Sequence, residues 1–286
     1  MIPSSRQRET SRGRPPARPG TRHGQAPVVL SIAGSDNSGG AGIQADLKTF
    51  TTLGVYGTTA VTCVVAEHPG RVLNITPIPP ARVADQVRLV LEAFPVVAIK
   101  TGLLYSAEII AAVGEAVRPA LKKGVPLVVD PVMVASTGRV LLQKEAIQAL
   151  RKFIASATIV TPNRDEAALL WGGPIADLKT LDEAALDLAR KFGRPFILAK
   201  GGHLKTGQAF DVLAAPDGHL CHFSAPRIPH IDPHGTGCTY SAAITVGLAK
   251  GLTVPEAVAL GKWFINRALR RRFEIGPYQL LNHLPV

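Results

Sequence analysis

Aromatic side chains, cysteines and long apolar runs are all scarce in this chain of 286 residues. Only three cysteines occur, Cys63, Cys221 and Cys238, and no two of them form a CxxC pair. Their number and spacing argue against a disulfide framework or a cysteine zinc site and fit a reducing, cytoplasmic environment. No apolar run approaches the length that crosses a membrane, so we expect no membrane partner. Aromatics make up 5% and apolar residues 46% of the chain, which predicts a sizeable core of Ala, Val, Leu and Ile.

Acidic residues are almost absent from the N-terminal segment, and this imbalance produces much of the net charge. Residues 1–27 carry six arginines against the single acid Glu9, which supplies +5 of the formal +11. The segment is rich in Ser, Pro and Gly and lacks the hydrophobic stretch of a secretory signal, so we expect a disordered basic tail. A second basic cluster lies at 267–272. We interpret both as solvated surface rather than a nucleic-acid site, with a basic rim that attracts an anionic substrate as the alternative for the second.

From residue 28 onward, short apolar runs alternate with helical patterns. Expected strands are 28–33, 58–66, 72–78 (an edge strand), 96–99, 127–129, 158–160 and 196–199, followed by a hairpin of 210–214 and 219–223. Expected helices are one marked by Ile43, Leu47 and Phe50, then 81–94, 107–121, 144–155, 164–171, 181–192, 237–250 and 254–272, the last two closing the chain. The alternation predicts a single α/β domain over 28–286, with a mostly parallel sheet flanked by helices on both faces.

The stretch 232–239, DPHGTGCT, is the most informative motif. A glycine-rich turn feeds directly into an apolar helical run, which brings free backbone N–H groups and the positive end of a helix dipole to one point. Such a point binds phosphate, so Gly235, Thr236 and Gly237 are candidate catalytic residues. Cys238 falls in the first turn, where the same field is expected to favour its thiolate. An inert small residue is the alternative reading of Cys238.

The loop after the first strand, 34–42, is rich in glycine and serine, which leaves room for a ligand to approach backbone. It contains a GxGxxA match at 40–45, but six residues separate this match from the strand, whereas a dinucleotide fold needs a tight turn there. We therefore discount a dinucleotide oxidoreductase. Asp46, in the helix that follows, is either a buried, capped or paired acid or a carboxylate that hydrogen-bonds substrate, and the residues alone leave these readings even.

Polar side chains also follow three later strands. Asp130 ends the strand at 127–129, and Asn163 and Glu166 follow the next one. These groups suit a metal or phosphate site, although Asn163 and Glu166 also fit a helix capping box. Lys200 follows a further strand and precedes two glycines, where it can neutralise phosphate or simply open a turn. In parallel sheets ligands bind beyond the carboxyl ends of strands, so we expect these residues at one edge.

Taken together, these segments resemble the hydroxymethylpyrimidine/phosphomethylpyrimidine kinases. The resemblance runs from about residue 28 to about residue 262 in order and spacing, and it is carried by IAGSD at 32–36, SGGAGIQADLKTF at 38–50, LGVYG at 53–57, DPVM at 130–133, TPN at 161–163, KGGH at 200–203 and HGTGCT at 234–239. It implies a ribokinase-like fold and two successive transfers of ATP γ-phosphate in thiamine biosynthesis. The acceptors would be 4-amino-5-hydroxymethyl-2-methylpyrimidine and then its monophosphate. It also implies Mg²⁺ and a homodimer.

The resemblance also implies residue roles. The pyrimidine would lie near Gly34, Asp46, Glu67, Leu103, Val132 and Cys238. Nucleotide would lie near Asn163, Lys200 and Thr236, and the metal near Asp130 and Glu166. Cys238 would take the hydroxyl proton or hold the alcohol in line.

Three departures from the family pattern bear on the substrate. Glu67-His68-Pro69 stands where Gln-Asn-Thr is common, and a carboxylate only accepts hydrogen bonds whereas an amide also donates. Leu103 replaces a common Met, and Thr137-Gly138-Arg139 adds charge where an acid is common. A pyridoxal kinase of the same fold therefore stays open as an alternative, as does a non-catalytic nucleotide or pyrimidine sensor.

Overall fold

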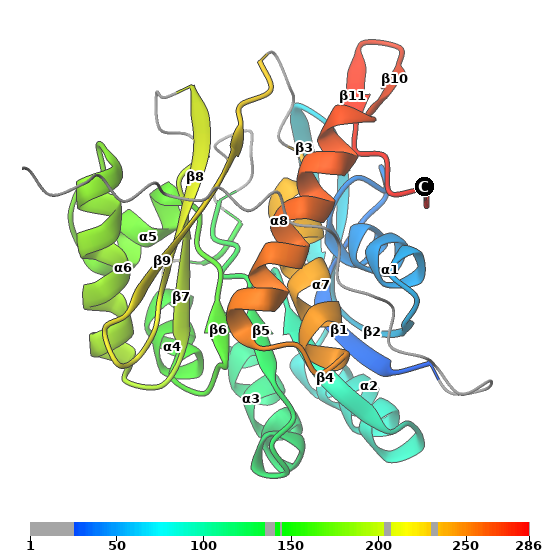
Figure 1. The fold of residues 1–286 in the computed structure, drawn as a ribbon. Helices are drawn as coiled ribbons and strands as arrows, with labels where there is room; N and C mark the ends of the chain where they lie inside the picture. The colour runs from blue at the N-terminus through cyan, green and yellow to red at the C-terminus, as the bar shows by residue number, and fades with distance from the viewer. Residues whose placement is uncertain (1–25, 135–140, 144, 203–206, 230–233, 286) are drawn as a thin grey trace, which may run out of the picture.

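The computed structural model describes residues 26–134, 141–143, 145–202, 207–229 and 234–285. Nearly all of the expected basic tail, and the departure at 137–139, lie outside the described residues. Figure 1 shows a central sheet with helices on both faces. The strands are β1 (Val28–Asp36), β2 (Tyr56–His68), β3 (Arg71–Pro77), β4 (Val96–Thr101), β5 (Leu127–Val129), β6 (Ile159–Val160), β7 (Phe196–Lys200), β8 (Gln208–Ala214), β9 (Leu220–Pro226), β10 (Phe273–Ile275) and β11 (Tyr278–Leu280).

Within the described residues nine strands form one sheet in the order β3-β2-β1-β4-β5-β6-β7-β8-β9. The six strands β1, β2 and β4 to β7 run parallel, and β3, β8 and β9 pair antiparallel at the two ends. The predicted edge strand and the predicted hairpin are both confirmed. The parallel strands all direct their carboxyl ends to one edge, which is where a ligand site is expected.

The helices are α1 (Gly42–Thr52), α2 (Pro80–Ala93), α3 (Ala107–Lys122), α4 (Ala146–Ile154), α5 (Arg164–Trp171), α6 (Leu178–Phe192), α7 (Thr236–Ala249) and α8 (Val254–Arg270). Helices α2 to α6 pack on one face of the sheet and α1, α7 and α8 on the other (Figure 1). Helix α7 lies against the sheet beneath α8, so every residue from Thr239 to Gly247 is buried. This position explains why its sequence is apolar all round rather than on one stripe.

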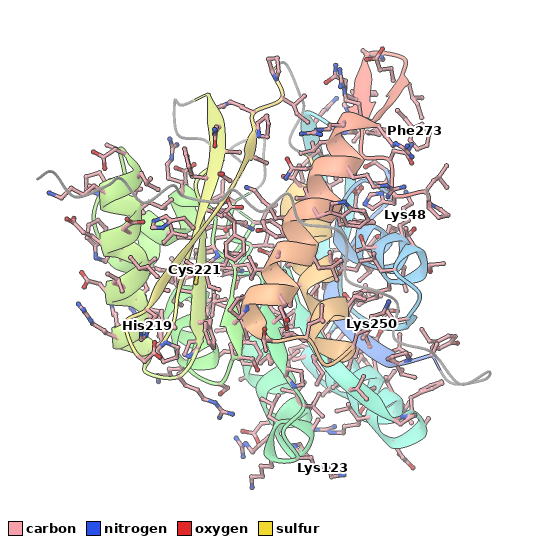
Figure 2. All side chains as sticks on the ribbon, in the orientation of Figure 1. Lys48, Lys123, His219, Cys221, Lys250 and Phe273 are labelled. Atoms are coloured by element: carbon pink, nitrogen blue, oxygen red, sulfur yellow. The ribbon has the colours of Figure 1, made fainter. Side chains whose placement is uncertain are left out.

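The expectation that two helices close the chain is wrong. After α8 the antiparallel pair β10-β11 turns at Gly276 (φ 56°), and Tyr278 Oη lies 3.1 Å from His68 Nδ1 at the end of β2. This hairpin borders a second cavity, of about 660 Å³, together with α1. Figure 2 shows Phe273 of the hairpin and Lys48 of α1 on the same side of the molecule, and Cys221 far from them on β9.

Candidate functional site

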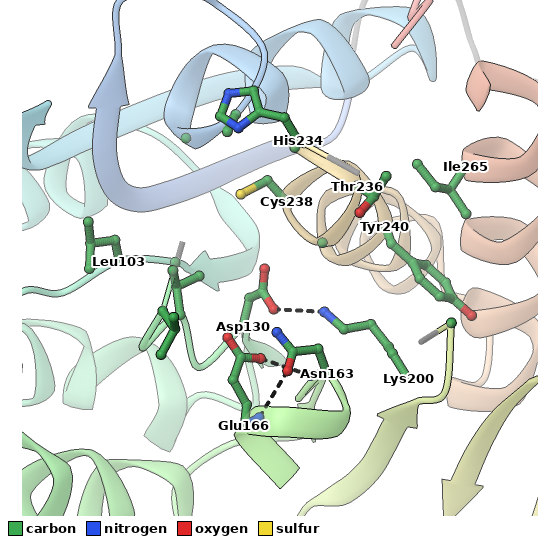
Figure 3. Close-up of a pocket in the computed structure, with 18 of the residues that line it drawn as sticks. Leu103, Asp130, Asn163, Glu166, Lys200, His234, Thr236, Cys238, Tyr240 and Ile265 are labelled. Carbon is green, nitrogen blue, oxygen red and sulfur yellow. Dashed lines mark hydrogen bonds and ion pairs between the residues drawn. The ribbon is translucent and has the colours of Figure 1, made fainter. Parts of the chain in front are cut away.

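A cavity of about 570 Å³ opens at the carboxyl ends of the parallel strands, beside the N-terminus of α7. Figure 3 shows Leu103 at one end, Tyr240 and Ile265 at the other, and Asp130, Lys200 and Cys238 between them. The cavity brings together twelve of the thirteen residues singled out from the sequence. They are Gly34, Glu67, Leu103, Asp130, Val132, Asn163, Glu166, Lys200, Gly235, Thr236, Gly237 and Cys238.

The thirteenth, Asp46, is placed differently from the expectation that it binds substrate. Its side chain is fully buried and is not among the residues that line the cavity. Its Oδ2 accepts from Ser31 Oγ at 2.5 Å and from Lys100 Nζ at 2.9 Å. Burial alone would lower the pKa of the Lys100 ammonium, but the adjacent carboxylate outweighs it and raises that pKa. Of the two readings left open for Asp46, the structure therefore shows the paired, buried acid.

Glycine is required where α7 begins. Gly235 has φ 76°, and a Cβ there would come within 1.8 Å of the carbonyl oxygen of Gly40. A Cβ on Gly237 would lie 3.2 Å from Lys200 Nζ. The turn into α7 thus packs directly on the loop after β1 and leaves its first amides next to a cationic side chain. This is the geometry that the glycine-rich motif predicted for an anion site.

Asp36 and His234, which sequence reasoning did not single out, join these two loops. Asp36 accepts hydrogen bonds from the backbone N–H groups of Ser38 (2.7 Å), Gly40 (3.1 Å) and Ala41 (2.7 Å), and His234 Nε2 lies 3.0 Å from its Oδ2. Burial opposes ionisation, but these donors outweigh it and lower the pKa of Asp36 to about 2. The anionic Asp36 therefore organises the loop around itself.

Asp130 is the polar centre of the cavity. Its Oδ1 accepts from Thr161 Oγ1 at 3.0 Å and from Lys200 Nζ at 3.2 Å, while its Oδ2 accepts from Ser241 Oγ at 3.2 Å. Although burial opposes ionisation, the charges of Lys200 and then Lys100 lower the pKa of the Asp130 carboxyl. The same pairing raises the pKa of Lys200 against the effect of burial. Both groups are therefore held in their charged forms at the cavity wall (Figure 3).

Glu166 and Asn163 form the capping box that the sequence predicted as one reading. The Asn163 side chain accepts from the backbone N–H of Glu166 at 2.9 Å, and Glu166 Oε2 accepts from the backbone N–H of Asn163 at 2.8 Å. Burial raises the pKa of Glu166 to about 7, although the charge of Lys200 opposes the shift, and the charge of Asp130 adds to it. Both residues also line the cavity, so the capping role and a ligand role are compatible.

The expectation that Cys238 is a thiolate is wrong for the protein without ligand. Burial raises the pKa of the Cys238 thiol to about 12, and the carboxylates of Asp130 and Asp46 add to this against the charge of Lys100. The helix-start argument counted the local dipole but not these groups, which come from other elements. Cys238 is thus a neutral thiol in the first turn of α7.

The far end of the cavity contains residues that sequence reasoning missed. Lys262 Nζ donates to Asp211 Oδ2 at 2.6 Å and to the carbonyl oxygen of Ala209 at 2.9 Å, which joins α8 to β8. Tyr240 and Ile265 line the cavity next to this pair. Asp211 and Lys262 lie in a hairpin strand and a helix face without a local motif, so no sequence signal marked them.

The chain is similar to known kinases over most of its length. The family model described as phosphomethylpyrimidine kinase matches residues 36–283. The hydroxymethylpyrimidine/phosphomethylpyrimidine kinase of Synechococcus elongatus is 43% identical over 257 residues, which cover 88% of this chain and 95% of that protein. The thiamine biosynthesis bifunctional protein ThiED of Geobacter sulfurreducens is 44% identical over 250 residues, which cover 87% of this chain and 50% of that larger protein.

Among solved structures, the ADP complex of Bacillus subtilis pyridoxal kinase superposes with a TM-score of 0.80 and 36% identity, covering 91% of this chain and 98% of that one. The predicted ribokinase-like fold is confirmed. No helix in the described part of the chain is both long enough and apolar enough to cross a membrane. Because the family model matches residues 36–283 and the Synechococcus elongatus kinase is 43% identical over most of both chains, the chain is a phosphotransferase and belongs to the phosphomethylpyrimidine kinase family.

Proposed function

We propose that the protein transfers the γ-phosphate of ATP to 4-amino-5-hydroxymethyl-2-methylpyrimidine and then to the resulting monophosphate, in thiamine biosynthesis. The observation that carries this proposal is one continuous cavity with the N-terminus of α7 near its middle. Leu103 lies on one side of the α7 N-terminus, and Tyr240 and Ile265 lie on the other (Figure 3). This arrangement suits an alcohol and a nucleotide that meet end to end at the glycine turn.

The proposed chemistry follows from general features of phosphoryl transfer. The transition state is loose, so catalysis depends mostly on positioning and on charge stabilisation. The backbone N–H groups of Gly235, Thr236, Gly237 and Cys238 would stabilise the transferred group, and Lys200 would neutralise it. Because the Cys238 thiol is neutral, we assign it the role of holding the acceptor hydroxyl in line rather than that of a strong base. Gly34 and Val132 would form walls of the acceptor site.

Asn163, Lys200 and Thr236 would contact the nucleotide, and Asp130 and Glu166 would hold Mg²⁺ directly or through water. The fit of this metal is reasonable because both groups offer carboxylate oxygens, the ligands that Mg²⁺ prefers. Asp130 Oδ2 has only the Ser241 hydroxyl as its hydrogen-bond donor among the described residues. When bound, Mg²⁺ would neutralise charge that develops on the phosphate oxygens. We further propose that the protein is a cytoplasmic homodimer.

A pyridoxal kinase is the second candidate. Its support is the Bacillus subtilis pyridoxal kinase, which shares the fold and 36% identity over 91% of this chain. The two functions differ only in the acceptor, so fold and catalytic geometry do not separate them.

The test is Mg²⁺-dependent ADP release with three acceptors supplied separately: hydroxymethylpyrimidine, its monophosphate and pyridoxal. We expect turnover of both pyrimidines, little turnover of pyridoxal, and loss of all turnover when EDTA removes the metal. Turnover of pyridoxal alone would contradict the proposed substrate and favour the second candidate. ADP release that does not depend on any acceptor would contradict both.

A further inference from the structure

The C-terminal segment after β11 contacts the first turn of α7 through one buried side chain, that of His283. Thr52 Oγ1 of α1 donates to the carbonyl oxygen of His283. The backbone N–H of the neighbouring Asn282 donates to the carbonyl oxygen of Ala268 in α8 at 3.2 Å. The segment is therefore held by two helices, and the His283 imidazole, which is 5% exposed, is a fixed part of the interior.

The imidazole of His283 bonds to the hydroxyl of Thr239 in α7, with Nε2 and Oγ1 2.9 Å apart. Burial, and then the charge of Lys48, lower the pKa of His283 to about 4, while a hydrogen bond with the backbone of Leu281 opposes the shift. The ring is therefore uncharged at neutral pH. Because the imidazole donates to Leu281 through its other nitrogen, Nε2 is left to accept a hydrogen bond from the Thr239 hydroxyl.

This contact is unusual for a hydroxyl inside a helix. The buried side chains of Ser241 and Thr245, also in α7, place their oxygens 2.9 and 2.8 Å from the carbonyl oxygen four residues earlier. Hydroxyl side chains in helices commonly take this backbone bond, which bends the helix. For Thr239 the carbonyl four residues earlier is that of Gly235, and in the described part of the chain its hydroxyl is directed to His283 instead.

The carbonyl of Gly235 is part of the turn on which the proposed chemistry depends. It accepts from the backbone N–H of Thr239 at 2.9 Å, which closes the first turn of α7. The same peptide group carries the N–H of Thr236, one of the amides proposed to stabilise the transferred phosphate. A second bond, from the Thr239 hydroxyl to the Gly235 carbonyl, would tilt this peptide group and with it the N–H of Thr236.

We propose that His283 is a positioning residue for phosphoryl transfer: it binds the Thr239 hydroxyl, keeps that hydroxyl off the Gly235 carbonyl, and so keeps the amides of the glycine turn aligned. Neither Thr239 nor His283 is among the described residues that line the cavity, so the pair acts on substrate only through α7. The proposal rests on the proposed function for the role of the amides and adds a residue of the C-terminal segment to it.

The experiment measures kcat and both KM values by ADP release with hydroxymethylpyrimidine as acceptor, and the urea midpoint of each variant. In His283→Leu the Thr239 hydroxyl loses its partner and turns to the Gly235 carbonyl. We expect kcat to fall about tenfold with both KM values within about threefold, because the amides stabilise charge that develops in the transition state. Thr239→Val has no hydroxyl to misdirect, so in the His283→Leu background it should bring kcat back to within about threefold of the wild type.

Two polar variants test the same point without an apolar substitution. The side-chain amide of His283→Gln reaches the position of Nε2 and should keep kcat within about threefold, whereas that of His283→Asn reaches only the position of Nδ1 and should lower kcat about tenfold. The matched control is Thr245→Val, which removes a buried hydroxyl farther along the same helix and should leave kcat within about twofold.

Three outcomes would overturn the inference while turnover by the wild type leaves the proposed function intact. The first is an unchanged kcat in His283→Leu. The second is a loss of kcat in His283→Leu that Thr239→Val does not reverse, which is the result that loss of packing alone would give. The third is an equal kcat in His283→Gln and His283→Asn. If the wild type turns over pyridoxal but neither pyrimidine, the proposed substrate is wrong, and the same comparison with pyridoxal as acceptor decides the role of His283, because the turn acts on the phosphate and not on the acceptor ring.

Discussion

Two aspartate–lysine pairs in the described part of the chain are built almost alike. Asp46 and Lys100 are 2.9 Å apart with both side chains 0% exposed, and Asp130 and Lys200 are 3.2 Å apart with 2% and 12% exposure. Only the second pair lines the cavity. Residue type and the distance between the charged atoms therefore do not distinguish the two pairs. The small remaining access to the cavity does.

The difference in access has an electrostatic consequence. Lys100 is completely enclosed, and Asp46 is the carboxylate that bonds to it. Lys200 has the cavity on one side and the charges of both Asp130 and Glu166 acting on it. Loss of Asp46 would leave the Lys100 ammonium buried without a compensating charge. Loss of Asp130 would leave the Lys200 ammonium next to a second carboxylate, that of Glu166, and next to the cavity. We expect mutations to separate the two pairs into one that affects stability and one that affects catalysis.

The largest predicted effect is that of Asp130→Asn on activity. The change removes the carboxylate that faces Lys200 and would hold the metal, so we expect kcat/KM to fall about a thousandfold. The free energy of unfolding should fall by only about 1 to 2 kcal/mol, because Glu166 and the cavity remain beside Lys200. Steady-state ADP release and urea denaturation measure the two quantities. An active Asp130→Asn protein would show that this pair is structural as well.

Asp46→Asn should have the opposite signature. It leaves the Lys100 ammonium buried without its anion, and we expect a loss of about 3 to 5 kcal/mol in the free energy of unfolding. The protein that remains folded should keep its acceptor KM within about threefold, because Asp46 does not line the cavity. The matched control is Asp85→Asn, which breaks the exposed Arg82–Asp85 pair and should cost at most about 1 kcal/mol. If Asp46→Asn instead raised the acceptor KM selectively, the result would support the hypothesis that Asp46 contacts the substrate directly.

Asp46 is an example of a contact that could not be predicted from the sequence. Asp130, Asn163 and Lys200 were found from the sequence because each follows a strand, and the carboxyl ends of parallel strands meet at one edge. The partner of Asp46 is 54 residues away on β4, and only the packing of α1 on the sheet brings the two together. No local pattern encodes that distance, so the paired and the ligand-binding readings stayed equal.

The same limit applies to the other differences. The Asp36–His234 contact spans 198 positions. The raised pKa of Cys238 depends first on burial and then on charged groups outside its own helix, among them Asp130 after β5 and Asp46 of α1. The closing hairpin β10-β11 was missed for another reason. Its strands have three residues each, too few for a period to be read.

A third pair, Asp211–Lys262, provides the finest test of whether enclosure sets the cost of breaking an ion pair. Its side chains are 4% and 11% exposed, and Lys262 also donates to the carbonyl oxygen of Ala209. In Asp211→Asn the ammonium therefore keeps one acceptor and some access to the cavity, so we expect a loss of about 1 to 2 kcal/mol, between those of Asp46→Asn and Asp85→Asn. Because the pair borders the proposed nucleotide end, the KM for ATP should rise a few fold while that for the acceptor stays constant.

Urea denaturation of the three Asp→Asn variants under one set of conditions decides the order. If Asp211→Asn is as costly as Asp46→Asn, access to the cavity does not relieve a buried charge, and the distinction between the first two pairs must come from the ligands that they hold.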